Sequence, residues 1–138
     1  RVQGRVEGED HTLHPMDSPP ASLVVKITCG TEALERLNQG FTVAATALAA
    51  GGDVSLWLTG DATLMAVPGR AEAVHLPDAA PLAELRDLLL EGAGVTVCGQ
   101  CAARRGLTVE DLVPGARIRG AAAFVEEVMA PGARSLVY

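Results

Sequence analysis

The most reactive pattern in the sequence is a pair of cysteines, Cys98 and Cys101, separated by two residues. The β-branched residues 95–97 predict a buried strand, and residues 102–105 favour helix, so the strand should change to a helix at or just after Cys98. A thiol at the start of a helix faces unpaired N–H groups and the positive end of the helix dipole. Both favour the thiolate, which is the nucleophilic form of cysteine near neutral pH.

The neighbours of Cys98 suit sulfur chemistry. Cys101 follows about one helical turn later, so its sulfur can reach back to the first one. Gly99 leaves the first thiol uncovered by a side chain. Arg104 and Arg105 add positive charge, although at the end of a short helix they also complement the negative end of its dipole. Cys98 is therefore the candidate nucleophile, Cys101 its candidate partner, and the two arginines accessory candidates.

The segments before this pair alternate between strand and helix. Residues 23–28 form a nearly continuous apolar run that predicts a buried strand ending at Cys29. Thr31 is the expected cap of the helix that follows it. Residues 53–58 predict a second strand, and Asp61 is the expected cap of a short helix after that strand. This order predicts parallel strands joined by a right-handed crossover.

The rest of the chain continues the alternation. Helices are expected over residues 82–92 and 121–129, a short strand over 116–119 and a final strand over 134–138. Together these segments predict an α/β fold, an open three-layer α/β/α domain over residues 22–138 with a mostly parallel sheet of about five strands.

Catalytic groups in such sheets gather at the carboxyl ends of the strands. Cys29 and Cys98 end the first and third strands, and Asp61 follows the second. If the first and third strands are neighbours, the two sulfurs lie close together at the same edge of the sheet. Cys29 is interpreted as a small buried residue, with an accessory role as the alternative. Asp61 is a further accessory candidate.

Composition excludes several classes of function. The 138 residues carry a net charge of -6 and include one Trp, one Tyr and two Phe, which argues against binding nucleic acid. The longest nearly apolar stretch, residues 41–50, is far shorter than the roughly 20 residues of a membrane span. Charged residues and prolines stand near the N-terminus in place of an apolar signal core, so a cytoplasmic location is expected, and three cysteines do not form a disulfide framework.

Other segments carry no site motif. Residues 1–21 lack apolar periodicity and are interpreted as a flexible N-terminal tail or an expression remnant, and the His11-x-x-His14 spacing within them as part of a solvated tail. Glu126 and Glu127 are interpreted as a solvated helix face. No phosphate-binding glycine motif or serine-hydrolase motif occurs, so no cofactor is expected.

From about residue 23 to the C-terminus, the chain resembles the DsrE-like proteins, small α/β sulfur carriers and relatives described as predicted peroxiredoxins. The matching segments are Thr28-Cys29-Gly30-Thr31, Leu56 to Ala62, Val97-Cys98 with Gly106 eight positions later, Gly120 with the helix after it, and Ala133 to Tyr138. The resemblance implies that Cys98 takes up sulfur as a persulfide and passes it to the thiol of a partner protein. It also implies a homo-oligomer, a trimer or hexamer.

Three hypotheses remain open from the residues themselves. The first is a sulfurtransferase or sulfur-relay protein in which Cys98 accepts the sulfur and Cys101 is able to expel it by forming a disulfide. The second is a thiol-disulfide switch or binding module in which the two cysteines cycle without carrying sulfur. The third is a metal site made by Cys98, Cys101, Cys29 and His75.

Overall fold

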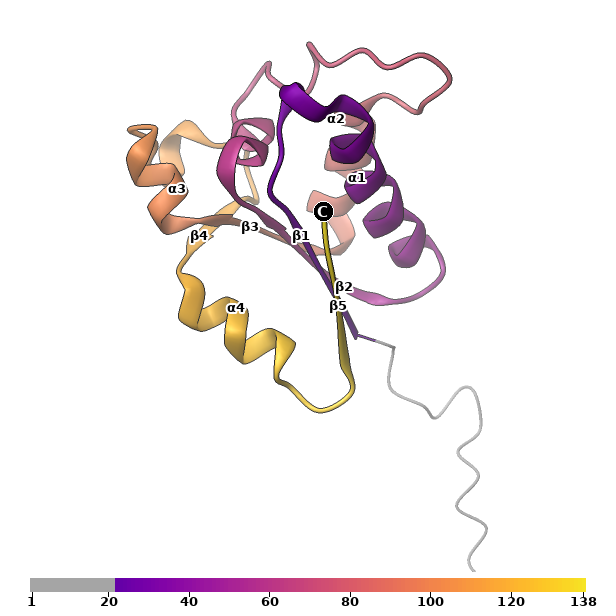
Figure 1. The fold of residues 1–138 in the computed structure, drawn as a ribbon, viewed down its shortest axis with the longest axis vertical. Helices are drawn as coiled ribbons and strands as arrows, with labels where there is room; N and C mark the ends of the chain where they lie inside the picture. Colours follow the sequence, from indigo (N-terminus) through magenta and orange to yellow (C-terminus); the bar gives the residue numbers. More distant parts are fainter. Residues whose placement is uncertain (1–21) are drawn as a thin grey trace, which may run out of the picture.

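The computed structural model describes residues 22–138, and its centre is a sheet of five parallel strands in the order β4-β3-β2-β1-β5 (Figure 1). The strands are β1 (Ser22–Ile27), β2 (Asp53–Leu58), β3 (Gly94–Cys98), β4 (Arg117–Arg119) and β5 (Ala133–Val137). The predicted α/β fold with a parallel sheet is confirmed. The tail at residues 1–21, with His11 and His14, lies outside the described residues.

Helices lie on both faces of this sheet. They are α1 (Leu34–Ala49), α2 (Leu82–Gly92), α3 (Gly99–Arg104) and α4 (Ala121–Val128), with 3₁₀ turns η1 (Thr31–Ala33), η2 (Gly60–Ala66) and η3 (Val109–Asp111). Helices α1 and α2 pack together on one face, α4 lies on the other, and α3 lies at the carboxyl edge of the sheet (Figure 1). In the part of the chain described, no helix is long and apolar enough to cross a membrane.

The main core lies between the sheet and the α1–α2 pair. Alternate strand residues point into it, as expected for strands with helices on both faces. It includes Val25, Ile27, Leu56, Leu58 and Val97 from the strands and Leu37, Phe41, Leu85 and Leu89 from the helices. Close packing between the sheet and the α1–α2 pair fixes the strands, and it therefore fixes the positions of the loops at their carboxyl ends.

The opposite face of the sheet is more polar and is covered by α4, none of whose residues is buried. Lys26, Trp57 and Thr96 lie across this face at matching positions of β1, β2 and β3. Val125 of α4 is 47% exposed. The eight residues of α4 are too few to bury a full stripe, and the ring of Phe124 makes the aromatic contact with the sheet.

The strand-end loops of β1 and β2 interlock through two glycines. A Cβ atom on Gly30 would lie 2.6 Å from the Asp61 Cβ atom, and one on Gly60 would lie 2.5 Å from the Thr28 carbonyl oxygen. Only glycine allows this close approach, and Gly60 also has a φ of +53°. The interlock places the residues after β2 directly beside those after β1.

Candidate functional site

Cys98 occupies the expected junction, as the last residue of β3 and the N-cap of α3. Its thiol is half-buried. Partial burial by itself raises the pKa of Cys98, but the backbone amides of Cys101 and Gln100 and the Cys101 thiol act in the opposite direction, and so does the positive charge of Lys26. The net effect is a pKa below that of an ordinary cysteine thiol. Cys98 therefore combines access to solvent with an increased share of the thiolate.

Cys101 lies one turn further along and is buried. The Gly60 amide donates a hydrogen bond to its sulfur over 3.2 Å. The sulfur also faces Cys98, whose pKa it helps to lower. Cys101 thus connects α3 to the loop after β2 and remains within reach of the candidate nucleophile.

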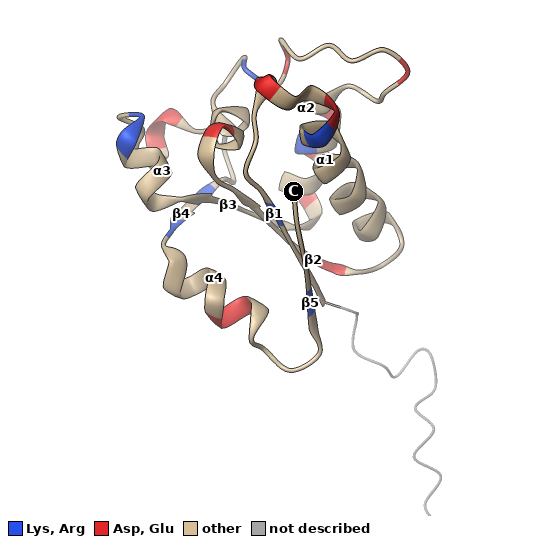
Figure 2. Ribbon diagram, in the orientation of Figure 1, with Lys and Arg blue, Asp and Glu red and all other residues tan. Residues whose placement is uncertain are grey.

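Asp61 and Arg105 form an ion pair, with 2.6 Å between the Asp61 Oδ1 and an Arg105 guanidinium nitrogen. Arg105 also donates a hydrogen bond to the Cys101 carbonyl oxygen. Asp61 was expected to cap a helix, but its side chain makes no capping hydrogen bond, because it pairs with Arg105 instead. Arg104 is exposed in the last turn of α3, at the basic end seen in Figure 2.

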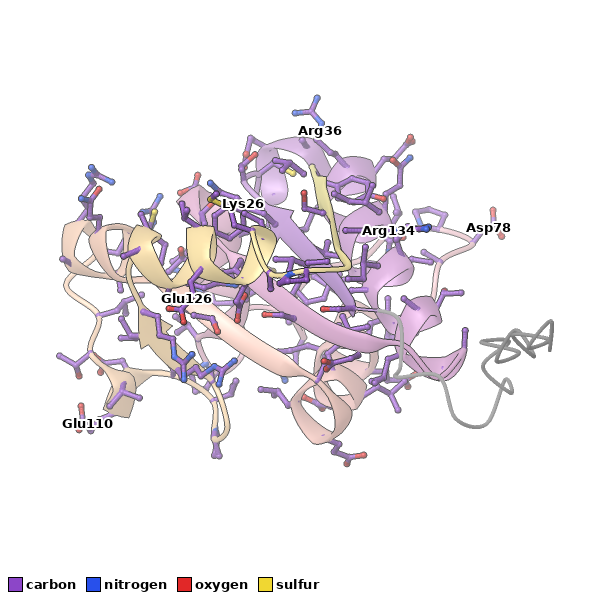
Figure 3. The ribbon with its side chains drawn as sticks, turned by 90° about the horizontal axis from the view of Figure 1, so that it is seen from below. Lys26, Arg36, Asp78, Glu110, Glu126 and Arg134 are labelled. Carbon is purple, nitrogen blue, oxygen red and sulfur yellow. The ribbon has the colours of Figure 1, made fainter. Side chains whose placement is uncertain are left out.

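A small cavity of about 60 Å³ adjoins Cys98. Its lining comes from three strands and the helix across them: Lys26, Trp57, Thr59, Cys98, Ala121 and Phe124. The Lys26 Nζ lies 4.8 Å from the centre of the Phe124 ring, within the range of a cation-π contact. Figure 3 shows Lys26 beside α4. Cys98 therefore shares a small, mainly apolar cavity with one lysine and two aromatic residues.

Glu127 fixes the position of Trp57, which lines this cavity. Its carboxylate accepts hydrogen bonds from the Trp57 indole N–H and the Ser55 hydroxyl. The Trp57 and Phe124 rings meet edge to face, with centroids 5.4 Å apart. The interpretation of Glu127 as part of a solvated face was therefore wrong, since one turn of α4 aims it at the sheet. Its neighbour Glu126 is exposed.

Cys29 is separated from this site by strand order. Strand β2 lies between β1 and β3, so Cys29 and Cys98 do not end neighbouring strands. The Cys29 side chain is 4% exposed and belongs to the main core. Burial, helped by the negative charge of Glu32, raises the pKa of Cys29. Cys29 therefore has the properties of a buried packing residue.

The structure does not assemble the proposed metal site. Between residues 22 and 138, no three Cys, His, Asp or Glu side chains lie together in a way that could hold a metal ion. His75 is exposed on the loop between η2 and α2, where it lines a different hollow with Asn38 and Leu82. Cys98 and Cys101 lie together at the start of α3, but Cys29 and His75 lie elsewhere in the fold.

Sequence reasoning missed the residues of the cavity wall. Lys26 carried a signal, since it is the one charged residue in the otherwise apolar run 23–27. In the β1–β2 register Lys26 pairs with Trp57. Phe124 and Glu127 carried no comparable signal, because their contacts with the sheet depend on how α4 is placed.

Comparison with known proteins decides the family. The profile of the DsrE/DsrF-like family matches residues 22–134, which is most of the chain. The chain belongs to the DsrE/DsrF-like family. A comparison with curated proteins found no match.

Two solved structures of DsrE-like proteins share the fold. The YchN protein from E. coli has 17% sequence identity and a TM-score of 0.71, with coverage of 85% of this chain and 98% of that one. A protein of unknown function from Methanobacterium thermoautotrophicum, MTH1491, has 12% identity and a TM-score of 0.58, with the same coverage of each chain. Both similarities support the three-layer architecture.

Proposed function

We propose that this DsrE-like protein is a sulfur-relay protein that carries sulfur as a persulfide on Cys98. The observation that carries the proposal is the environment of Cys98: a half-buried thiol with a lowered pKa, next to Lys26 and to a small cavity. Family membership supports the same class of role.

Sulfur uptake requires no net change in oxidation state. The Cys98 thiolate attacks the terminal sulfur of a low-molecular-weight persulfide, the sulfur-sulfur bond of the donor breaks, and the donor leaves as a thiol that takes the proton of that terminal sulfur. The product is a Cys98 persulfide anion. A thiolate with a lowered pKa suits this step because more of it is ionised at neutral pH.

Delivery of the sulfur has two routes. In the first, a thiolate of a partner protein attacks the terminal sulfur, takes it as a new persulfide and returns Cys98 to the thiolate. In the second, the Cys101 thiolate attacks the Cys98 sulfur, forms a disulfide and releases hydrosulfide, after which a dithiol reductant must restore both thiols. The closeness of the Cys101 sulfur to Cys98 supports the second route.

The same closeness favours one alternative, a thiol-disulfide switch in which Cys98 and Cys101 cycle without carrying sulfur. The Gly60 N–H that donates to the Cys101 sulfur would lose that geometry when the disulfide forms. Oxidation would then change the conformation of the loop after β2. This alternative predicts reversible loss of two thiols and no gain of sulfur.

The surface of this chain offers a place at which a partner protein or a second copy of the chain could bind. Exposed apolar side chains occur on α4 and its end, Val125 and Met129, and on the edge strand β5, Leu136 and Val137. Such residues are typical of protein interfaces. We therefore include a homo-oligomer, a trimer or hexamer, in the proposal, and a cytoplasmic location, where thiols stay reduced.

Intact mass spectrometry tests the proposal. The wild-type protein, reduced and then incubated with a low-molecular-weight persulfide, should gain the mass of one sulfur atom, and Cys98→Ser should gain none. Cys101→Ser should still gain the sulfur and hold it longer, because the internal route of release is closed. No sulfur on the wild type, together with reversible loss of two thiols in air, would instead favour the thiol-disulfide switch.

A further inference from the structure

The cavity beside Cys98 has features that an ordinary gap in packing lacks. Lys26, Thr59, Trp57 and Phe124 line it, mostly through apolar atoms, and the half-buried Cys98 opens onto it. Its volume of about 60 Å³ is on the order of two water molecules of the liquid. It therefore has room for a group of one or two atoms.

We propose that this cavity is the binding site for the terminal sulfur of the Cys98 persulfide, with the Lys26 ammonium as its counter-ion. The inference rests on the proposed function, because it concerns the product of sulfur uptake at Cys98. It adds the ligand class of the site, a single anionic sulfur, and a residue that binds it. Neither follows from Cys98 alone.

Lys26 lies next to the space that we assign to the sulfur anion. Its ammonium group lies over the Phe124 ring, and that ring is itself packed against Trp57. Among residues 22–138 no carboxylate forms an ion pair with Lys26, and the Glu127 carboxylate of α4 is engaged by Ser55 and Trp57. The positive charge of Lys26 is therefore available to a ligand.

The walls of the cavity strengthen this interaction. The Trp57 side chain is 2% exposed, and the Phe124 ring covers it from the α4 side. Aromatic walls exclude water and lower the local dielectric constant, so a sulfur anion and an ammonium group attract each other more strongly than at an open surface. The titratable groups that act on the Cys98 sulfur are Lys26 and Cys101, and only Lys26 brings a positive charge.

The electron balance of uptake gives Lys26 its role. When the Cys98 thiolate attacks a donor persulfide, the new sulfur-sulfur bond forms at the Cys98 sulfur, the donor bond breaks, and the donor thiolate leaves with the proton of the transferred sulfur. The negative charge that began on the Cys98 sulfur then resides on the terminal sulfur, one bond further out. Lys26 lines the cavity into which that charge moves, and its positive charge acts on the Cys98 sulfur.

The test compares Lys26→Met with Arg36→Met. Met keeps the length of the lysine side chain without its charge, and Arg36 is an exposed cation on α1 that projects away from the molecule (Figure 3). After loading with a low-molecular-weight persulfide and removal of the donor, the half-life of the added sulfur is followed by intact mass. We expect Lys26→Met to lose it about tenfold faster than the wild type, the scale of one charge-assisted contact. Arg36→Met should match the wild type.

Three further measurements separate a charge effect from a packing effect and test where the sulfur lies. Lys26→Arg restores the cation and should restore most of the half-life, and Phe124→Leu, which removes the ring that positions Lys26, should shorten it. Trp57 is the one tryptophan of the chain, so its emission should change when wild-type Cys98 is loaded. Unchanged emission on a protein whose mass confirms the added sulfur would place that sulfur outside the cavity.

The outcomes distinguish this inference from the proposed function. If the wild type gains no sulfur, the proposed function fails and the binding site fails with it. If the wild type and Lys26→Met gain and keep one sulfur equally well, sulfur carriage stands and the site proposed here is overturned. A tenfold shorter half-life in Lys26→Met, rescued by Lys26→Arg, supports the site.

Discussion

Two cysteines follow parallel strands of the same sheet, yet their surroundings are opposite. Cys98 ends β3, is half-exposed and has a lowered pKa. Cys29 follows β1, is buried in the main core and has a raised pKa. Position at the carboxyl end of a strand is common to both. What differs is the next element and the charge beside it.

The chain after each cysteine explains the difference. A helix begins directly after Cys98, so amide N–H groups face the sulfur, and Lys26 adds a positive charge across the sheet. After Cys29 the chain turns through Gly30, whose amide donates to the Glu32 carboxylate, so the nearby charge is negative. Activation of a thiol at a strand end therefore depends on the charges and N–H groups of the turn that comes next in the chain.

The largest expected effect is on thiol reactivity. At pH 7 one thiol of the native protein should react rapidly with iodoacetamide. Cys98→Ser should lose this phase and react at least about tenfold more slowly, because the two remaining thiols are buried and iodoacetamide reaches them poorly. Cys29→Ser should keep the fast phase. A fast phase that survives Cys98→Ser and disappears in Cys29→Ser would reverse the comparison.

The pH dependence of the same reaction sharpens the contrast. A lowered pKa means that the Cys98 rate rises with pH with a midpoint below the ordinary value of about 8.5. A raised pKa means that the Cys29 rate, measured in the double variant Cys98→Ser with Cys101→Ser, has a midpoint above it. Alkylation rates measured from pH 5 to pH 10 check both directions, and equal midpoints would contradict the assignment.

A smaller effect concerns the glycine that joins the two regions. Gly60→Ala should lower the free energy of unfolding by about 3 kcal/mol, because the new Cβ atom would meet the Thr28 carbonyl and the residue would keep a positive φ. The matched control is Gly69→Ala, which has a φ of +84° and open space around its Cβ position, with an expected cost of about 1 kcal/mol. Urea unfolding measures the free energy of unfolding of both variants. Equal losses would show that the close contact between Gly60 and the Thr28 carbonyl does not restrict residue 60.

The smallest effect distinguishes the two arginines after Cys101. Arg105→Met should cost about 0.5–1 kcal/mol, since it breaks a partly exposed ion pair with Asp61 and a hydrogen bond to the Cys101 carbonyl. Arg104→Met should change stability by less than about 0.5 kcal/mol, as is usual for an exposed side chain. Thermal unfolding of the two variants side by side checks the order, and a larger loss for Arg104→Met would contradict it.

Much of this contrast follows from local sequence. The β-branched residues 95–97 and the helix formers after Gly99 place the strand-to-helix junction at Cys98, where the structure has it. The apolar run that ends at Cys29 predicts a residue at the end of a buried strand. In both cases the backbone pattern within one segment decides the outcome.

The remainder depends on how segments are arranged in space. Hydrophobic periodicity does not fix the lateral order of strands, so the position of β2 between β1 and β3 could not be derived from it. Lys26 and Phe124 meet only because α4 crosses that face of the sheet. Glu127 was misread for the same reason, since a single turn of α4 decides which carboxylate meets Trp57.

The central claim is that Cys98 carries the sulfur and Cys29 does not. The direct measurement is peptide mass mapping of the wild-type protein after loading with a low-molecular-weight persulfide and blocking of the free thiols with iodoacetamide, without prior reduction. The account predicts one added sulfur on the peptide that contains Cys98 and an unmodified or merely alkylated Cys29. Added sulfur on Cys29, with Cys98 alkylated directly at its own thiol, would contradict it.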